Sequence, residues 1–238
     1  MARPARICVL ADSHAAALKH GWSLIEKDFP GTEFTFFPGT IKSEWSSLRA
    51  IDGKLVPQSP VLREHFARCV HRKSEIEDEY DAYLICGITL SIAITLKTWL
   101  GLEDKDWATH RAIVAARIGA GNAAHVLAVL REITTKPVLL LAAPFQPRAF
   151  CLFSPSLDAE TAATIRTIFH EECERLAARH GAKFFAQPRE TWAANGVTTK
   201  MRYANKQPVN GREDRHHCTA EFGAIVLRAV LEQGFAAD

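Results

Sequence analysis

Short apolar runs alternate with amphipathic segments along the chain. Each apolar run is bounded by turn-forming residues, which is typical of strands buried on both faces of a parallel sheet; the runs are 6–11, 33–37, 82–86, 137–143 and 182–186. The segments between them have helical spacing and lie around 15–28, 60–78, 90–100, 108–133, 159–180 and 219–233. This alternation predicts a three-layer α/β/α fold, in which helices cover both faces of a doubly wound, five-stranded parallel sheet of flavodoxin-like type.

Local signals define one helix and one turn within this pattern. The helix around 159–180 has Asp158 as a candidate N-cap and Gly181 as a candidate C-cap, residue types that suit the two ends of a helix. Between the second and third strands, Asp52-Gly53 lies among apolar residues, which predicts a β-hairpin. We expect this hairpin to stand over the edge where the second strand ends and to form one wall of a pocket.

The composition is that of an ordinary globular protein. Of the 238 residues, 47% are apolar and 24% are charged, and a chain of this length can build one hydrophobic core. We therefore expect a single domain over residues 1–238. The net charge of +2 is too small to attract the phosphate backbone strongly, so nucleic acid is not an expected partner.

Cysteine spacing and hydropathy narrow the class of protein further. The six cysteines include no C-x-x-C pair, so the sequence predicts neither a disulfide framework nor a zinc site, and we expect a cytoplasmic location. The longest uncharged stretch, 82–96, is interrupted by polar residues and is too short for a spanning helix. We expect no membrane association, no metal and no cofactor.

Polar residues follow the predicted strands at their carboxyl ends, where doubly wound sheets bind their ligands. They include Asp12-Ser13-His14 after the first strand, Gly39 after the second and Thr89 after the third. The fifth strand is followed by a long polar segment, 187–215, and connections of this length are usually functional.

An acid and a histidine at the end of this polar segment add a second element. Asp214 and His217 are three residues apart, just before the last predicted helix. In that arrangement Asp214 can accept the Nδ1 proton of His217, which leaves Nε2 free to take a proton from the Ser13 hydroxyl. The alternative is structural: Ser13 would cap the first helix, and the acid and histidine would belong to a solvated loop that caps the last one.

These two elements resemble motifs of the SGNH or GDSL-like hydrolase family. Leu10-Ala11-Asp12-Ser13-His14 is similar to the family's first block, in which the serine is the nucleophile. Asp214-Arg215-His216-His217 is similar to the last block, Asp-x-x-His.

The resemblance implies a serine esterase that cleaves a small acyl ester such as an acetyl ester, with a carbohydrate as one candidate for the alcohol. An O-acyltransferase would use the same triad. The resemblance also implies an oxyanion hole built from the N–H groups of Ser13 and Gly39 together with Thr89. Asp12 and His14 would then belong to the pocket wall.

The sequence departs from the family's pattern at two positions. Ala11 stands where the first block has glycine, and Thr89 stands where the third block has the asparagine that helps to hold the oxyanion. Loss of one such donor costs about 2.7–4 kcal/mol of transition-state stabilisation. A non-catalytic SGNH-like domain that binds a carbohydrate or a protein therefore remains an alternative.

A dinucleotide-binding turn is a further alternative, because an apolar run precedes Gly119-Ala-Gly121-Asn-Ala-Ala124. That fingerprint requires an acidic residue at the end of the next strand, whereas the run at 138–143 ends without one. A helix break between small residues is the simpler interpretation.

The remaining candidate residues give weaker signals. Asp12, His14, Asp214, His216 and His217 could be imagined as metal ligands, but they lack the regular spacing of a metal site. The other histidines, including His65, His71, His110, His125, His170 and His180, are expected at the surface. Trp45 follows the second strand closely enough to line a pocket.

Overall fold

The computed structural model describes residues 5–39, 44–70, 73–146, 157–206, 214 and 217–235. Its main sheet has five parallel strands in the order β2-β1-β6-β7-β8. Their bounds are Arg6–Ala11 for β1, Glu33–Pro38 for β2, Ala82–Cys86 for β6, Val138–Leu141 for β7 and Lys183–Phe184 for β8. The first strand lies between the second and third strands of the sheet, so the predicted doubly wound order is confirmed.

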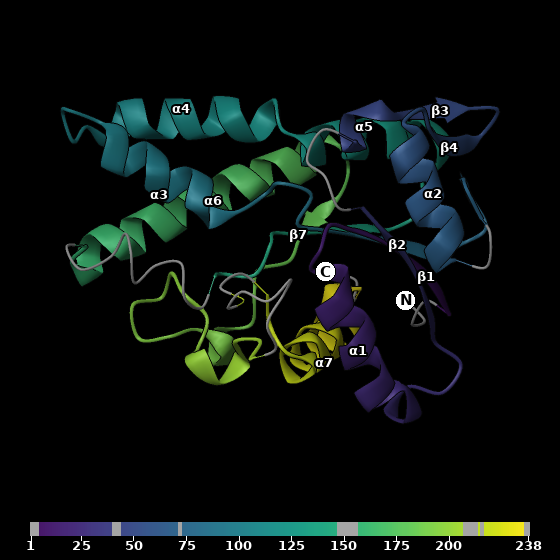
Figure 1. Ribbon diagram of the computed structural model, residues 1–238. Helices are drawn as coiled ribbons and strands as arrows, with labels where there is room; N and C mark the ends of the chain where they lie inside the picture. The colour runs from purple at the N-terminus through teal and green to yellow at the C-terminus, as the bar shows by residue number, and fades with distance from the viewer. Residues whose placement is uncertain are drawn as a thin grey trace.

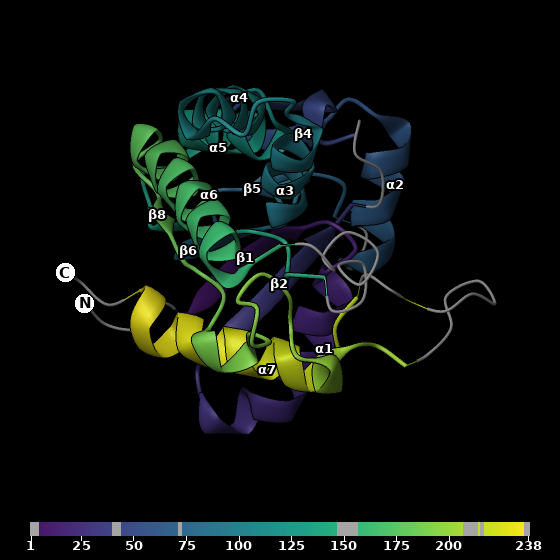
Figure 2. The ribbon, with the colours of Figure 1, turned by 90° about the vertical axis from the view of Figure 1, so that its left-hand side faces the viewer.

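Helices form a layer on each face of this sheet (Figures 1 and 2). One layer consists of α1, Ala15–Ile25, and α7, Ala220–Ala229. The other contains α2, Pro60–Cys69, α3, Ile92–Gly101, α4, Trp107–Gly119, α5, Asn122–Ile133, and α6, Ala159–Arg179. Short 3₁₀ turns cover Glu26–Asp28, Trp45–Ser47, Arg189–Thr191 and Met201–Tyr203, and a π-helical turn at Val230–Gly234 follows α7.

Two of the expected helices are interrupted. The helix expected over 60–78 ends at Cys69, and Ile76–Glu77 forms strand β5 instead. Ile76 is fully buried and pairs with Leu55, and so short an apolar run cannot be assigned to helix or strand by its spacing. The helix expected over 108–133 is broken at Gly121, the N-cap of α5.

This break removes the dinucleotide-binding alternative. The apolar run before Gly119 belongs to helix α4 rather than to a strand, and the fingerprint requires a strand at that place. The interpretation as a helix break is confirmed. In α6, Asp158 accepts a hydrogen bond from the Thr161 N–H at 2.7 Å, and Gly181 follows the helix with φ of +59°, as the capping signals predict.

The predicted hairpin is present, but it does not lie where we expected. Strands β3, Leu48–Ile51, and β4, Lys54–Pro57, are antiparallel, with positive φ at Asp52 and Gly53 in the turn. Strand β4 also pairs with β5, which leads into the amino end of β6. This third strand holds the turn end of the hairpin near the amino end of β6, and no residue of β3 or β4 lines the cavity beside Ser13.

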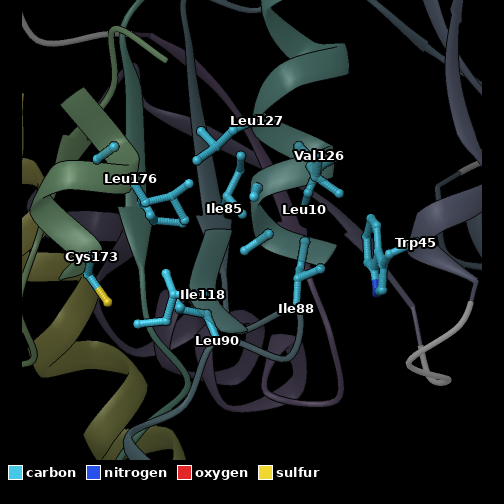
Figure 3. Close-up of a cluster of buried hydrophobic side chains, with 14 of the residues drawn as sticks. Leu10, Trp45, Ile85, Ile88, Leu90, Ile118, Val126, Leu127, Cys173 and Leu176 are labelled. Carbon is cyan, nitrogen blue, oxygen red and sulfur yellow. The ribbon is translucent and has the colours of Figure 1, made fainter. Parts of the chain in front are cut away.

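The larger core cluster lies between the sheet and the layer of α2 to α6. Figure 3 shows Leu10 of β1 and Ile85 of β6 against Leu127 of α5, with Leu176 of α6 beside them. All four side chains are at most 1% exposed. Close packing of this kind resists displacement, so the carboxyl ends of β1 and β6 form a rigid base.

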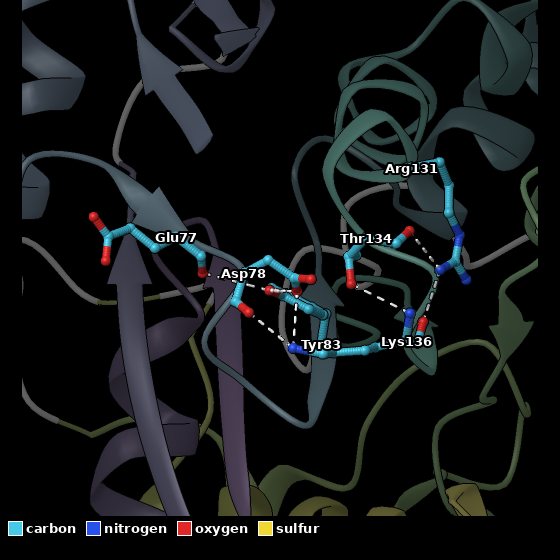
Figure 4. A network of polar contacts seen from close by, with 6 residues as sticks. All are labelled: Glu77, Asp78, Tyr83, Arg131, Thr134 and Lys136. Carbon is cyan, nitrogen blue, oxygen red and sulfur yellow. Dashed lines mark hydrogen bonds and ion pairs between the residues drawn. The ribbon is translucent and has the colours of Figure 1, made fainter. Parts of the chain in front are cut away.

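A polar network ties together the amino ends of β6 and β7 (Figure 4). The Tyr83 hydroxyl donates to Asp78 Oδ1 at 2.8 Å, and the Lys136 ammonium lies 3.2 Å from the same oxygen. The Arg131 guanidinium donates to the Lys136 carbonyl at 2.7 Å. Burial raises the pKa of Tyr83, and the hydrogen bond to Asp78 raises it further. Because this network lies at the edge opposite Ser13, we assign it a structural role.

Within the described residues, no single helix combines the length and the apolar composition of a membrane span, and α4 and α5 reach them only as a pair bent by 46°.

Helices α1 and α7 cross at very short range through two glycines. A Cβ atom built on Gly223 would overlap the Ala17 carbonyl oxygen, and one built on Gly21 would overlap the backbone of α7 at Gly223 and Ala224. Ser13 lies just before α1, and His217 lies just before α7. The contact between the two helices therefore fixes the distance between the serine and the histidine.

Replacement of Gly223 by alanine is expected to lower the free energy of unfolding by about 1–3 kcal/mol, the usual cost of overpacking. The added methyl group meets backbone atoms, which cannot rotate away as a side chain can. Chemical denaturation measures the change. Gly101→Ala is the matched control, because its new Cβ would enter open space at the end of α3. Equal stability of the two variants would contradict the close crossing.

Candidate active site

Ser13 lies in the turn between β1 and α1, at the carboxyl edge of the sheet. The Ala15 N–H donates to the Asp12 carbonyl at 2.9 Å, which closes this turn. The Ser13 side chain is exposed, and its N–H makes no hydrogen bond to any described residue. The N-terminus of a helix carries a partial positive charge, so the turn presents a hydroxyl and a free N–H group where negative charge is favoured.

Asp214 and His217 form a hydrogen-bonded pair. His217 Nδ1 lies 3.0 Å from Asp214 Oδ1 and 2.9 Å from Oδ2, and the His217 backbone N–H donates to Oδ1 at 3.0 Å. The Asp214 side chain is 2% exposed and that of His217 is 29% exposed. A carboxylate only accepts hydrogen bonds, so this contact places the proton on Nδ1 and leaves Nε2 as an acceptor.

Asn205 is a positioning residue that the sequence analysis did not identify. Its side-chain amide donates to Asp214 Oδ2 at 2.8 Å, and its backbone N–H donates to the His217 carbonyl at 3.0 Å. Asn205 belongs to the polar segment 187–215, for which we expected a functional role, but no spacing distinguishes it from other polar residues there. Both contacts of Asn205 hold the aspartate and the histidine in place.

Ser13 and His217 line the same cavity, which has a volume of about 650 Å³. Its other lining residues are Asp12, His14, Trp45, Thr89, Ser91, Ala93, Ile94, Lys97, Arg117, Ala143 and Gln146. A second cavity, of about 410 Å³, is lined by Ser13 and His217 together with Asn205, Asp214 and Cys218 among others. The structure therefore brings the predicted serine, histidine and acid together, with space on two sides of them.

Asp12 and His14 form a second carboxylate–imidazole pair beside Ser13. His14 Nδ1 lies 2.6 Å from Asp12 Oδ1, and the Thr89 N–H also donates to the Asp12 carboxylate. Burial alone would raise the pKa of Asp12, but the hydrogen bonds and charge of His14 outweigh burial and lower it. Asp12 is therefore ionised and already bonded to His14, so it is not the partner that orients His217.

The structure corrects the role expected for Gly39. Its N–H donates to the Ala11 carbonyl at 2.9 Å, because the ladder between β1 and β2 continues past the end of β2. That N–H is consequently not available to an oxyanion. A Cβ on Gly39 would lie 2.7 Å from the Trp45 indole, so the glycine allows Trp45 to pack closely. Trp45 lines the cavity as expected, whereas the hairpin after it does not.

Thr89 lies in a strained turn at the cavity wall. Its φ is +67° and that of Ile88 is +49°, and positive φ is unfavourable for β-branched residues. Such strain is often found at functional sites. The Thr89 N–H contacts the Asp12 carboxylate, and Thr89 lines the cavity, so its hydroxyl is a candidate donor to a ligand. The Ser13 N–H and the Thr89 hydroxyl are therefore the candidate donors to an oxyanion that the structure leaves on the cavity wall after the loss of Gly39.

The neighbouring thiols are too weakly acidic to act as nucleophiles near neutral pH. Burial raises the pKa of Cys218, next to His217, to about 12, and burial also raises the pKa of Cys86. A thiol must ionise to attack, so both are inactive near neutral pH. Among the described residues, no three histidine, cysteine, aspartate or glutamate side chains could hold a metal ion. His216 lies outside the described residues.

His110 is a further correction to the sequence analysis. It is fully buried instead of exposed, and its Nε2 lies 2.8 Å from the Thr95 carbonyl. The stacked rings of Trp99 and Trp107 pack edge-on against it. Burial in this aromatic cluster lowers the pKa of His110, so the side chain serves as a neutral part of the core.

Comparison with known proteins identifies the type of fold. No family model matches the sequence, and no curated protein matches it. The structure is similar to that of the extracellular lipase from Streptomyces rimosus, with a TM-score of 0.50 and 16% identity over 94% of this chain and 98% of that chain. This likeness shows that the chain shares the α/β fold of that lipase.

Two other structures give lower scores. The periplasmic domain of a lipopolysaccharide acetyltransferase from Salmonella ser. Paratyphi A has a TM-score of 0.49 and 11% identity, over 97% of this chain and 84% of that one. Phospholipase A1 from Streptomyces albidoflavus has a TM-score of 0.46 and 12% identity, over 96% and 99%.

Proposed function

We propose that the chain is a serine esterase that cleaves a small acyl ester through Ser13, His217 and Asp214. The observation that carries this proposal is the buried Asp214 carboxylate bonded to His217 Nδ1, with His217 and Ser13 on the wall of one cavity. A solvated capping loop would not require a buried acid whose hydrogen-bond partners orient one imidazole. The same arrangement defines a nucleophile, a base and an orienting acid.

The proposed reaction is acyl transfer in two steps. His217 Nε2 takes the proton of the Ser13 hydroxyl as its oxygen attacks the ester carbonyl carbon, and the same proton then passes to the leaving alkoxide. Water next attacks the acyl-enzyme, gives a proton to His217, and releases the carboxylic acid as Ser13 regains its proton. Asp214 stays ionised and stabilises the imidazolium form of His217.

The negative charge on the tetrahedral intermediate needs donors already in place. The Ser13 N–H has no partner among the described residues, and it lies at the start of α1, where the helix dipole favours an anion. We propose the hydroxyl of Thr89, a residue of the cavity wall, as the second hydrogen-bond donor to the oxyanion. With Gly39 excluded, this oxyanion hole has fewer donors than the motif resemblance implies.

The two cavities beside Ser13 support O-acyl transfer as a second candidate function. Ser13 and His217 line both, so an acyl donor could occupy one while an acceptor hydroxyl approaches from the other. The acceptor would replace water in the second step, with no change in the residues used. A sugar hydroxyl suits this role, and product analysis with and without a sugar acceptor separates transfer from hydrolysis.

Labelling with a fluorophosphonate tests whether Ser13 is activated, because this reagent modifies an activated serine. We expect stoichiometric labelling of the wild-type protein at Ser13 and none of the Ser13→Ala variant, as measured by mass spectrometry. Ser23→Ala is the matched control, since Ser23 is exposed near the other end of α1 and outside both cavities. Absence of labelling in the wild-type protein would favour the non-catalytic, carbohydrate-binding or protein-binding alternative.

A further inference from the structure

Two cationic side chains line the main cavity together with Ser13 and His217. Lys97 extends from α3 and Arg117 from α4, which pack against each other. On α3, Ala93 and Ile94 line the cavity along with Lys97, so one face of this helix forms a continuous wall. The cavity therefore has a catalytic end at β1 and a cationic end between two helices.

The Arg117 guanidinium is held by a buried hydroxyl. Its Nη1 donates to Thr98 Oγ1 at 2.9 Å, and that hydroxyl in turn donates to the Ile94 carbonyl at 2.8 Å. Thr98 is 5% exposed. A guanidinium has five N–H donors, so this contact orients the group and leaves further donors for a ligand.

Neither cation has a carboxylate partner among the described residues. Elsewhere in the described chain, ion pairs hold Lys54, Arg68, Lys73, Arg111, Lys136, Arg175 and Arg228. Within the cavity lining, the carboxylate is Asp12, which His14 and Thr89 already occupy. The cationic end thus has a positive charge that no carboxylate of the described residues balances.

Lys97 lies further along α3 than the other α3 residues that line the cavity. Ser91 is the N-cap of α3, lines the cavity and follows Thr89 by two positions in the sequence. Lys97 is six residues after Ser91, on α3. Six residues of α-helix correspond to about 9 Å. A ligand that reaches along this wall from the Ser91 end to Lys97 is longer than an acetyl group, so the alcohol portion of the ester is the part expected at the cationic end.

We propose that the alcohol portion of the substrate carries an anionic group that binds to Lys97 and Arg117. This inference rests on the esterase function proposed above. Phosphate, sulfate and carboxylate share the required chemistry, because each accepts charge-assisted hydrogen bonds from a guanidinium and an ammonium. The substrate class is therefore an acylated, negatively charged alcohol, such as an O-acetylated sugar phosphate or an O-acetylated uronic acid.

Binding of the deacylated products tests this inference without any catalytic step. Calorimetry would compare glucose 1-phosphate, glucuronate and glucose on the wild-type protein. We expect at least one of the two anions to bind about 100-fold more tightly than glucose at low salt, or about tenfold for each cation. In about 1 M salt, where the screening length is ~3 Å, the difference should shrink strongly.

Charge-removing variants identify the residues responsible. Lys97→Gln and Arg117→Gln should each reduce the preference for the anion over glucose about tenfold, and the double variant should abolish it. Lys19→Ala is the matched control, since Lys19 is exposed on α1 and outside both cavities. Both target side chains are exposed at the cavity, so unchanged thermal unfolding is expected and should be verified.

The outcomes separate this inference from the esterase proposal. Equal binding of both anions and glucose, or an anion preference that survives in the double variant, overturns the inference even if Ser13 reacts with fluorophosphonate. Anion binding that depends on both cations, with no labelling of Ser13, supports the anion site and overturns the esterase. If only one anion is preferred, that result identifies the anionic group.

Discussion

Replacing Ser13 with alanine is expected to lower kcat for p-nitrophenyl acetate by roughly 10⁴- to 10⁶-fold, as found when the nucleophile of a triad is removed. His217→Ala should cause a loss of similar size. The Ser13→Ala/His217→Ala double variant should be little worse than either single one, because a nucleophile and its base act as a unit. Steady-state kinetics on variants with unchanged thermal unfolding measure these effects.

The comparison within this set is more informative than any single loss. Ser23→Ala should retain full activity, which excludes a general effect of serine removal on α1. If losses for Ser13→Ala and His217→Ala multiply in the double variant, the two residues act independently and the proposed proton transfer is wrong. A Ser13→Ala variant with a tenth or more of the wild-type rate would likewise require another nucleophile.

The layers of the fold were predictable because the relevant signals are local. Buried strands and amphipathic helices have distinct hydrophobic spacings, and the order in which they alternate restricts the topology. The position of the hairpin was not predictable from such signals. It depends on β5, Ile76–Glu77, whose few residues continue the helical pattern of the preceding segment although Ile76 pairs with Leu55.

The candidate site and its Asp214–His217 hydrogen bond could be predicted from the motifs, whereas the hydrogen bonds of Asn205 and of the Gly39 N–H could not. Ser13, Asp214 and His217 occur in recognisable spacings, and the structure brings them to one edge of the sheet. The Gly39 N–H is used by Ala11 because the β1–β2 ladder extends one residue beyond the strands. That depends on strand register, which sequence periodicity does not determine at a strand end.

Two residue types contribute to the site through partners far away in the sequence. No sequence motif marks either of them. Gly21 and Gly223 are ordinary helix residues in sequence, yet they allow the close crossing that brings Ser13 and His217 together. In sequence, Asn205 is one of many polar residues in its segment, and only the structure shows that its amide contacts Asp214. Contacts between segments far apart in sequence carry this part of the function.

Asp214→Asn is expected to lower kcat by about 10⁴-fold. The group at position 214 receives hydrogen bonds from the Asn205 amide, the His217 backbone N–H and His217 Nδ1, and all three are donors. A carboxylate accepts at both oxygens, whereas an asparagine must turn its own NH₂ group toward one of these donors. The hydrogen bond between position 214 and His217 then either breaks or moves the imidazole proton from Nδ1 to Nε2. With a proton on Nε2, His217 cannot accept the proton of Ser13.

The size of the loss distinguishes orientation by Asp214 from a merely structural role. Asn205→Ala removes one donor but leaves the carboxylate in contact with His217 Nδ1. We therefore expect only about a tenfold decrease in kcat, because a hydrogen bond to a charged group contributes ~1.5–3 kcal/mol. Nitrogen-detected NMR of the imidazole should show the Nδ1–H tautomer in wild type and in Asn205→Ala, and the Nε2–H tautomer in Asp214→Asn. A decrease of only a few-fold in Asp214→Asn, with the tautomer unchanged, would show that Asp214 does not orient the base.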